Sequence, residues 1–293
     1  MKGIILAGGS GTRLYPMTQA ASKQLLPIYD KPMIYYPLTT LMSAGIRDIL
    51  LITTEEDQPG FKRLFKDGSD FGINLEYIIQ PSPDGLAQAF LLGEDFIGNE
   101  ACAMVLGDNI FYGAALEKKL KQASVDAENG IASIFGYQVR DPWRFGIMEL
   151  DQKNNVLSVE EKPENPKSDY AITGLYFYPK GVSQLAKQVK PSARGELEIT
   201  DLNAIYLEQG NLKAQLLGDG YTWYDTGTFE SMNEACNMIR SIEFQGNRVV
   251  CCPEIIAYEN HWISREQLQQ RAELLKKNAY GQYLQSVLDK GEV

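Results

Sequence analysis

The chain opens on a short apolar run that ends abruptly in glycine. Residues 3–13 read GIILAGGSGTR, so that an apolar run at 4–6 leads into a loop containing Gly8, Gly9 and Gly11. A short apolar run bounded by glycine predicts a buried strand followed by a loop. Small residues in such a loop let backbone N–H groups approach a phosphate chain. The opening therefore predicts a phosphate-binding loop at the end of a strand.

The same alternation continues along the first part of the chain. Apolar runs predict further strands at 48–54, 74–80 and 101–109, with helices between them at 32–45 and 85–96. Strands that alternate with helices predict a parallel sheet with right-handed crossovers. In such sheets ligands bind beyond the carboxyl ends of the strands. The glycine loop, Gln80 and Asp108 all follow strand ends, so we expect them to share one pocket.

After residue 130 the expected strands follow one another with short connections, which favours antiparallel pairing. They are expected at 130–139, 145–151, 156–163 and 171–179, and helices at 181–189, 197–209, 228–240, 264–277 and 279–290. The fold class is therefore α/β: a mostly parallel, Rossmann-like central sheet flanked by helices, with an added β layer and a helical C-terminal extension. We expect residues 1–227 to form one body and residues 228–293 an extension for packing or oligomerisation.

Composition and charge exclude several classes of function. No stretch approaches the ~20 apolar residues of a membrane span, and the first apolar run is too short for a secretory signal, so we expect a cytoplasmic protein without a membrane partner. The net charge of −10 argues against nucleic acid as a partner. The single histidine, His261, has no motif around it, and the four cysteines form no C-x-x-C pair. Catalysis by imidazole and a cysteine zinc site are therefore not expected.

The glycine loop does not match the standard phosphate-binding motifs. A P-loop needs Gly-Lys where this chain has Thr12-Arg13, and a dinucleotide fingerprint needs a third glycine where Leu14 stands. A protein-kinase assignment lacks its H-R-D and D-F-G partners. Arg13 offers a forked donor and Lys23 a point charge, within a segment, 1–31, that holds four basic residues and one acidic residue. From the residues alone, the loop binds a small anionic ligand that carries phosphate.

Longer blocks of the sequence resemble one family. The segments GIILAGGSGTRLYPMT and SKQLLPIYDKPMIYYPL are similar to the sugar-1-phosphate nucleotidylyltransferases, whose signature is G-G-x-G-T-R-L…K-P. The blocks QPSPDGLAQAF, VLGDN, EEKP, TGLYFY, KPSARGELEITD and WYDTGT resemble its thymidylyl branch and run in the family's order to about residue 230.

This resemblance implies transfer of a thymidylyl group from dTTP to α-D-glucose 1-phosphate, with Mg²⁺ as cofactor and dTDP-glucose and pyrophosphate as products. The reaction opens dTDP-sugar synthesis, such as that of dTDP-rhamnose for polysaccharides and O-antigen. The resemblance also implies a homotetramer, built as a dimer of dimers, with a nucleotide half at about 1–130 and a sugar-phosphate half at about 131–227. A sugar phosphate has a second pKa near 6 and is mostly ionised at pH 7, so the reaction needs no general base.

On the nucleotide side, the resemblance implies that Arg13 and the glycine loop hold the triphosphate. The loop residues concerned are Gly8, Gly9, Ser10, Gly11 and Thr12, with Lys23 and Gln24 on the same side. Gln80 is assigned to the base, because its amide both donates and accepts, as a pyrimidine edge with N3–H and O4 requires. The backbone of Gly85 completes base recognition in the family.

On the sugar side, the resemblance implies that Lys162 holds the sugar phosphate. The other residues expected there are Glu161, Gly146, Gly174 and Asn109 at the sugar and Arg194 near the phosphates. Asp108 and Asp225 stand beside turn glycines after apolar stretches and are expected to hold Mg²⁺. Arg13, Lys23, Lys162, Asp108 and Asp225 are thus the expected catalytic residues.

Two other functions fit the same pattern. One is a nucleotidyltransferase that uses UTP or another triphosphate, because thymine differs from uracil by one methyl group, which binding discriminates weakly. The other is a non-catalytic sugar-nucleotide sensor, although a sensor should have lost Arg13, Lys23, Asp108 or Asp225, and all four are present.

The chain departs from the family at Asp219, Ile255 and Glu259. Family members often carry arginine at the first position, and an acid and a base at the other two. In the family these positions lie at or near a second nucleotide-sugar site used for feedback inhibition at a subunit interface. Because acids replace arginines there, we expect the end product to inhibit weakly or not at all.

Overall fold

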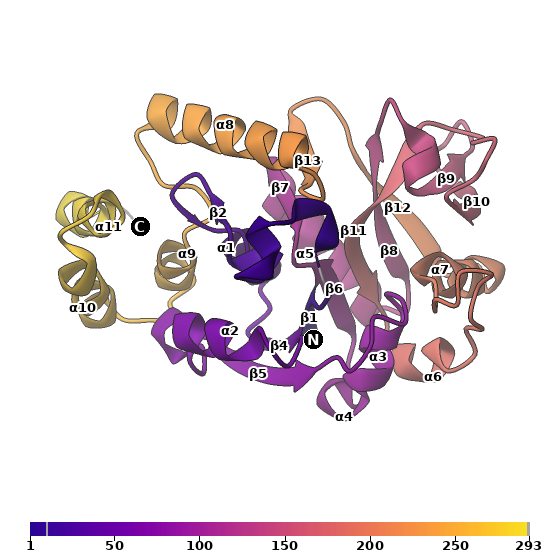
Figure 1. The fold of residues 1–293 in the computed structure, drawn as a ribbon, viewed down its shortest axis with the longest axis horizontal. Helices are drawn as coiled ribbons and strands as arrows, with labels where there is room; N and C mark the ends of the chain where they lie inside the picture. The colour runs from indigo at the N-terminus through magenta and orange to yellow at the C-terminus, as the bar shows by residue number, and fades with distance from the viewer. Residues whose placement is uncertain (10, 292–293) are drawn as a thin grey trace.

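A mixed sheet forms the centre of the molecule (Figure 1). The computed structural model describes residues 1–9 and 11–291. Within that part of the chain the sheet has nine strands, β1 (Lys2–Ala7), β4 (Asp48–Thr53), β5 (Asn74–Ile79), β6 (Cys102–Leu106), β8 (Ala132–Gln138), β9 (Gly146–Leu150), β10 (Val156–Glu161), β11 (Tyr170–Tyr178) and β12 (Leu212–Leu217). Their order is β10-β9-β11-β6-β1-β4-β5, and β8 and β12 follow on the other side of β11.

The first four strands of this sheet are parallel, as the sequence predicts. β1 lies between β4 and β6, and β5 follows β4. The register sets Ile5 opposite Leu51 and Val105, and all three side chains are buried. A strand covered on both faces has no polar side to show, which is why the runs of β1, β4 and β6 are continuously apolar, whereas the edge strand β5 contains the exposed Glu76.

The strands after residue 130 continue the same sheet. β11 pairs antiparallel with β6 and with β8, while β8 and β12 run parallel. One edge of β11 changes partner along its length: Ala171 pairs with Ile147 of β9, and Leu175 pairs with Val105 of β6. Gly174 lies between these two pairings. The predicted fold class is confirmed, and the fork at Gly174 is where the added strands diverge from the parallel ones.

Helices cover both faces of the sheet. They are α1 (Tyr35–Ser43), α2 (Gln58–Phe65), α3 (Gln88–Leu92), α4 (Glu94–Ile97), α5 (Leu116–Glu128), α6 (Val182–Ala186) and α7 (Ile199–Glu208). Because successive strand side chains point to opposite faces, Ile5 packs in one core with α1, α2 and α5, and Ile4 packs in the other with α3, α4, α6 and α7.

Several elements differ from the prediction. The helix expected at 85–96 is two short helices that meet at Gly93, where an added Cβ would lie 3.1 Å from the Ala89 carbonyl oxygen. The strand expected at 101–109 ends at Leu106, and a turn leads into β7 (Asn109–Gly113). β7 pairs with β13 (Tyr221–Asp225), and β2 (Pro27–Ile28) pairs with β3 (Lys31–Pro32), as two small antiparallel ribbons outside the main sheet.

The C-terminal region is helical, as predicted. It contains α8 (Phe229–Gly246), α9 (Pro253–Glu259), α10 (Arg265–Leu275) and α11 (Ala279–Lys290). Thr228 and Ser231 form a reciprocal capping box that fixes the start of α8. α9 packs against α1, and α10 and α11 lie at the end of the molecule far from α6 and α7 (Figure 1). In residues 1–9 and 11–291, no helix has the length and apolarity to cross a membrane.

Candidate active site

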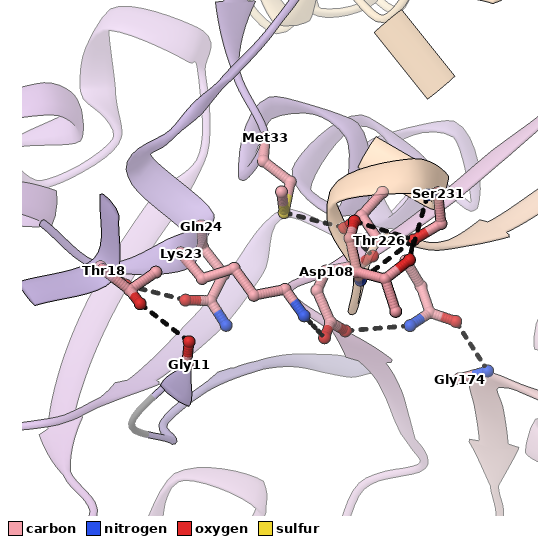
Figure 2. A network of polar contacts seen from close by, with 12 residues as sticks. Gly11, Thr18, Lys23, Gln24, Met33, Asp108, Gly174, Thr226 and Ser231 are labelled. Atoms are coloured by element: carbon pink, nitrogen blue, oxygen red, sulfur yellow. Dashed lines mark hydrogen bonds and ion pairs between the residues drawn. The ribbon is translucent and has the colours of Figure 1, made fainter. Parts of the chain in front are cut away.

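The glycine loop leaves β1 in a backbone conformation that favours glycine. Gly9 has a φ of +117° and Gly11 a φ of +57°. The Thr18 hydroxyl donates to the Gly11 carbonyl oxygen at 2.8 Å and fixes the far end of the loop (Figure 2). Ser10, which the sequence assigned to the triphosphate, lies outside the described residues. The loop is therefore positioned from both sides, by β1 and by Thr18.

Arg13 points from this loop toward Asp225. It lies in a 3₁₀ turn, Thr12–Leu14, anchored by the fully buried Leu14. An added Cβ on Gly227 would lie 3.3 Å from Arg13 Nη1 and 3.2 Å from Asp225 Oδ1. Because Gly227 has no side chain, the guanidinium and the carboxylate can both occupy this space.

Asp108 and Asp225 come together through the ribbon of β7 and β13. The register pairs Asn109 with Asp225, which places Asp108 beside the end of β13. Thr226 donates to the Asp108 carbonyl oxygen twice, from its backbone N–H at 3.1 Å and from its hydroxyl at 2.7 Å. These bonds join Thr226 to Asp108 (Figure 2) and so hold the adjacent Asp225 near Asp108, although the two aspartates are far apart in the sequence.

Lys23 forms an ion pair with Asp108 across this corner (Figure 2). Burial alone raises the pKa of Asp108, but the Lys23 ammonium and the Asn109 amide outweigh it and leave that pKa below its ordinary value. Burial and the neighbouring Asp108 charge raise the pKa of Asp225, against the opposing effect of Lys23 and Arg13. Two carboxylates thus lie close enough to repel each other and need further positive charge.

Asn109 holds the corner to the main sheet. Its Oδ1 accepts from Trp223 Nε1 at 2.6 Å and from the Gly174 backbone N–H at 3.1 Å, and its Nδ2 donates to Asp108 Oδ1 at 3.0 Å. An added Cβ on Gly174 would lie 2.7 Å from that Oδ1. Asn109 is thus committed to internal bonds, and Gly174 is glycine because the amide occupies the space of a side chain.

The residues expected at the sugar phosphate line one cavity of about 300 Å³. Glu161 Oε2 accepts a hydrogen bond from the Thr200 hydroxyl at 2.6 Å. An added Cβ on Gly146 would lie 3.0 Å from Glu161 Oε2 and 3.0 Å from Thr200 Oγ1. Lys162 Nζ lies 3.8 Å from Glu161, and the Arg194 guanidinium lies 3.4 Å from it. Arg194 is more tightly bound to Glu198, at 2.9 Å. Lys162 and Arg194, two of the four basic residues that line this cavity, thus already lie beside carboxylates.

Gln80 lines a second cavity, of about 850 Å³, beside the glycine loop, whereas Gly85, the other residue expected at the base, is not part of its lining. Gln80 follows β5, and its Oε1 lies only 1.8 Å from where a Cβ on Gly8 would stand, so Gly8 must be glycine. Gly85 has a φ of +109°, and a Cβ there would lie 2.4 Å from the Leu197 backbone. Leu197 donates from its N–H to the Asp84 carbonyl oxygen at 2.7 Å. The loop that contains Asp84 and Gly85 is thus hydrogen-bonded to the segment that carries Arg194 and Leu197.

The two cavities meet at Lys23 and Asp108. Lys23 lines the larger cavity and Asp108 the smaller, and the two side chains bond to each other. Gln24, by contrast, is buried beneath the loop, where its Oε1 accepts from the Ser22 hydroxyl at 2.8 Å. The Lys23–Asp108 pair therefore links the linings of the two cavities.

The donor set at this corner fits a hard divalent cation only in part. Within residues 1–9 and 11–291, no group of three or more acidic, histidine or cysteine side chains could enclose a metal ion. Asp108 and Asp225 supply two carboxylates. Mg²⁺ is usually held in this way, by one or two carboxylates with substrate phosphates completing the shell.

Some residues at the site were not predicted from the sequence. Thr226 and Thr200 orient Asp108 and Glu161, and Gln88 contacts Gln80. All three lie inside blocks that resemble the family, WYDTGT, KPSARGELEITD and QPSPDGLAQAF, but nothing in their residue type or spacing singles them out within those blocks.

Fold and site together define a class of protein. An α/β sheet with a glycine-rich loop, cations and two carboxylates at the carboxyl ends of its strands is the arrangement of an enzyme that acts on phosphate esters. The family model of the nucleotidyl transferases matches residues 2–241. This chain belongs to that family.

Relatives narrow the comparison further. The chain is 58% identical over 290 residues to the glucose-1-phosphate thymidylyltransferase of Neisseria gonorrhoeae, covering 99% of this chain and 100% of the relative. It is 53% identical to that of Mycobacterium tuberculosis, again over 99% and 100%. Among solved structures, a putative glucose-1-phosphate thymidylyltransferase from Bacillus anthracis in complex with sucrose is 40% identical, with a TM-score of 0.74, over 83% of this chain and 96% of that one. A UDP-glucose pyrophosphorylase with UDP-glucose bound is 25% identical, with a TM-score of 0.73, over 82% and 98%.

Proposed function

We propose that this chain transfers a thymidylyl group from dTTP to α-D-glucose 1-phosphate and releases dTDP-glucose and pyrophosphate. The observation that carries the proposal is the meeting of two cavities at Lys23 and Asp108. One cavity has the glycine loop and a pyrimidine-reading amide, and the other has Lys162 and Arg194. Relatives that match nearly the whole chain bear the name of this activity. The reaction joins a ligand of one cavity to a ligand of the other.

The chemistry needs cations rather than a base. Glucose 1-phosphate is mostly ionised at pH 7, because its second pKa is near 6. Its phosphate oxygen attacks the α-phosphorus of dTTP, and the bond to the β-phosphate breaks. Arg13 and Lys23 neutralise the triphosphate, and Lys162 and Arg194 hold the sugar phosphate. Catalysis of this kind rests on positioning and charge stabilisation.

We assign Mg²⁺ to Asp108 and Asp225, in agreement with the divalent metal generally used by the family. When bound, the ion supplies positive charge beside the phosphates that react. Lys23 bonds to Asp108 and keeps that carboxylate ionised, as a metal ligand must be. Asn109 and Thr226 hold Asp108 in place.

Recognition of base and sugar follows from the groups that line the two cavities. Gln80 and the backbone of Gly85 read the thymine edge, and Glu161 accepts from sugar hydroxyls against a wall made by Gly146 and Gly174. Uracil presents the same polar edge as thymine, so we expect dTTP to be preferred and UTP tolerated, with a ratio of at most about 10- to 200-fold.

One assay tests the proposal. The protein is given Mg²⁺, glucose 1-phosphate and each nucleoside triphosphate in turn, and pyrophosphate release is measured. We expect the highest rate with dTTP, and loss of the rate on addition of a chelator. A higher rate with UTP than with dTTP would favour a uridylyltransferase. The absence of turnover with every triphosphate offered would favour a non-catalytic sensor.

We further propose residues 1–227 as the catalytic body, with the nucleotide half at about 1–130, and residues 228–293 as an extension for packing between subunits. The assembly would be a homotetramer in the cytoplasm, at the start of a dTDP-sugar pathway such as that of dTDP-rhamnose. Light scattering on the full chain, compared with a chain ending before α10, tests the assembly: a tetramer that becomes smaller supports the assignment, and an unchanged state contradicts it.

A further inference from the structure

A chain of polar side chains runs behind the base-reading amide of Gln80. Gln80 Nε2 donates to Gln88 Oε1 at 2.7 Å, and Gln88 Nε2 donates to Asp84 Oδ2 at 2.8 Å. Gln88 Oε1 also accepts from the Asp84 backbone N–H at 3.3 Å, and the Ser82 hydroxyl donates to Asp84 Oδ2 at 2.6 Å. Gln80 and Gln88 are each only 8% exposed. The two buried glutamines and the exposed Asp84 form a relay that ends on a carboxylate.

The polarity of this relay is fixed at Asp84. A carboxylate only accepts hydrogen bonds, and a backbone N–H only donates them. Asp84 offers both groups to the same amide, so Gln88 must turn its Nε2 to the carboxylate and its Oε1 to the N–H. The hydrogen-bonding groups of Asp84 therefore fix the orientation of the Gln88 amide, although the oxygen and nitrogen of an amide are similar in size.

The orientation of Gln80 follows from that of Gln88. Because Gln88 presents an oxygen, Gln80 must meet it with Nε2, and a rotated Gln80 amide would set two oxygens 2.7 Å apart. Gln80 Oε1 then faces the other way, toward Gly8 at the edge of the nucleotide cavity. Gln80 thus presents an acceptor beside its remaining N–H.

That pattern complements one class of pyrimidine. Thymine and uracil place a donor, N3–H, beside an acceptor, O4, whereas cytosine places an acceptor, N3, beside an amino donor. A glutamine free to rotate pairs with either edge, because rotation exchanges its oxygen and nitrogen. A glutamine held in this orientation pairs with the edge of thymine or uracil. Against cytosine it would set donor against donor and acceptor against acceptor.

We propose that Gln88 and Asp84 are positioning residues that hold the Gln80 amide in the orientation that accepts thymine and rejects cytosine. The proposal rests on the proposed function, in which Gln80 reads the base. It assigns selectivity between pyrimidines to two residues that do not touch the nucleotide.

The decisive measurement is the ratio of kcat/KM for dTTP to that for dCTP, with glucose 1-phosphate as the second substrate. Gln88→Met keeps the length of the side chain and removes its acceptor, so the Gln80 amide can rotate. We expect the ratio to fall about 10- to 100-fold, which corresponds to the penalty for leaving buried polar groups mismatched. The change should lie mainly in KM, which rises for dTTP and falls for dCTP.

Gln88→Glu is the rescue variant. It is made together with Asp84→Asn, because two carboxylates would otherwise face each other at the 2.8 Å contact between positions 88 and 84. The new carboxylate still presents an acceptor to Gln80 Nε2, so the ratio should stay within about threefold of wild type. Asp84→Asn, at an exposed position, removes the carboxylate and leaves only the backbone N–H to fix the orientation of Gln88. It should therefore lower the ratio without emptying the interior, by less than Gln88→Met does. This variant tests the proposal even where the methionine variant does not fold.

The chain offers a matched control in α10 and α11. Gln269 Nε2 donates to Gln285 Oε1 at 2.7 Å, and Gln285 Nε2 donates to Asp289 Oδ1 at 2.8 Å, which repeats the same relay on the exposed surface. Gln285→Met should leave both the ratio and the rate unchanged.

Two results would overturn the proposal. One is a folded Asp84→Asn or Gln88→Met variant that is slower but keeps the wild-type ratio, and the other is a loss of the ratio in Gln88→Glu as large as in Gln88→Met. Calorimetric Kd values for dTTP and dCTP on the same variants separate the two proposals. A wild-type protein that binds dTTP selectively without turnover refutes the proposed activity, and the relay is then judged by the Kd ratio alone.

Discussion

The Lys23–Asp108 and Arg271–Glu254 ion pairs both join distant parts of the chain, but their surroundings differ. Glu254 is fully buried; Arg271 lies 3.0 Å from one of its oxygens, and the Tyr280 hydroxyl donates to the other at 2.5 Å. The Asp108 side chain is 23% exposed and lines a cavity. It also faces a like charge, which raises the pKa of Asp225 beyond the effect of burial.

The difference teaches how to separate a structural pair from one that awaits a ligand. At Glu254 every charge has its partner, and α9, α10 and α11 are closed around it. At Asp108 and Asp225 two carboxylates face the bonded Lys23 and the neighbouring Arg13, and both line an open cavity, where we propose that Mg²⁺ binds. The first pair should govern stability and the second activity.

The largest expected effect is on the stability of the closed pair. Glu254→Leu leaves the partly buried Arg271 with Asp70 alone, at 3.3 Å, and should lower the free energy of unfolding by about 3–5 kcal/mol. Urea unfolding measures this loss, and the rate per folded molecule should be unchanged. A folded variant whose rate falls as much as that of Lys23→Met would contradict the assignment of Arg271–Glu254 to stability.

Lys23→Met should show the opposite pattern. We expect kcat/KM to fall by about 100-fold or more, as for loss of a single electrostatic group at a reacting phosphate, or close to 3 kcal/mol. The midpoint of urea unfolding should move far less than in Glu254→Leu, because Asp108 reaches solvent through its cavity. Lys187→Met, at an exposed pair with Glu94, is the control and should keep its rate.

The sequence predicts the strands and the glycine loop better than it predicts the long-range contacts of the two ion pairs. The strands at 4–6 and 48–54 could be predicted because strands covered on both faces must be apolar. The glycine loop could be predicted because its motif is local in the sequence. α5 was not predicted, because its inward face is built largely from small residues, Ala123 and Ala127, and reads as weakly amphipathic.

Site geometry is harder to predict because its partners are distant in sequence. Asn109 bonds to Trp223 across 114 positions, and the residues alone gave no reason to pair Asp108 with Asp225, which resemblance supplied. Nothing local marks Gln88 or Glu254 either: each is a polar residue on a helix, and only the packing of other elements gives it a partner.

Gly174 also supports Asp108, because its backbone N–H donates to Asn109, which in turn donates to Asp108. A substitution at Gly174 therefore tests whether the Lys23–Asp108 site depends on this support. Gly174→Ala places a methyl group 2.7 Å from Asn109 Oδ1, which should cost about 1–3 kcal/mol of stability. The shift of Asn109 should also raise the KM for glucose 1-phosphate. Gly218→Ala is the control, since no atom lies within 4 Å of its added Cβ, and it should change stability by no more than about 0.5 kcal/mol. A Gly174→Ala variant with wild-type stability and KM would show that Asn109 does not support the corner.

The smallest expected effect concerns Glu259, on the same helix as Glu254. Burial and the neighbouring Glu117 charge raise the pKa of Glu259, so acidic groups gather on this surface. A diphosphate is repelled by such a surface, and the sequence places acids at Asp219 and Glu259 where relatives often carry arginine. We therefore expect micromolar dTDP-rhamnose to leave the rate unchanged. Inhibition curves for wild type and Glu259→Arg check this: the variant should gain weak inhibition, and strong inhibition of wild type would contradict the expectation.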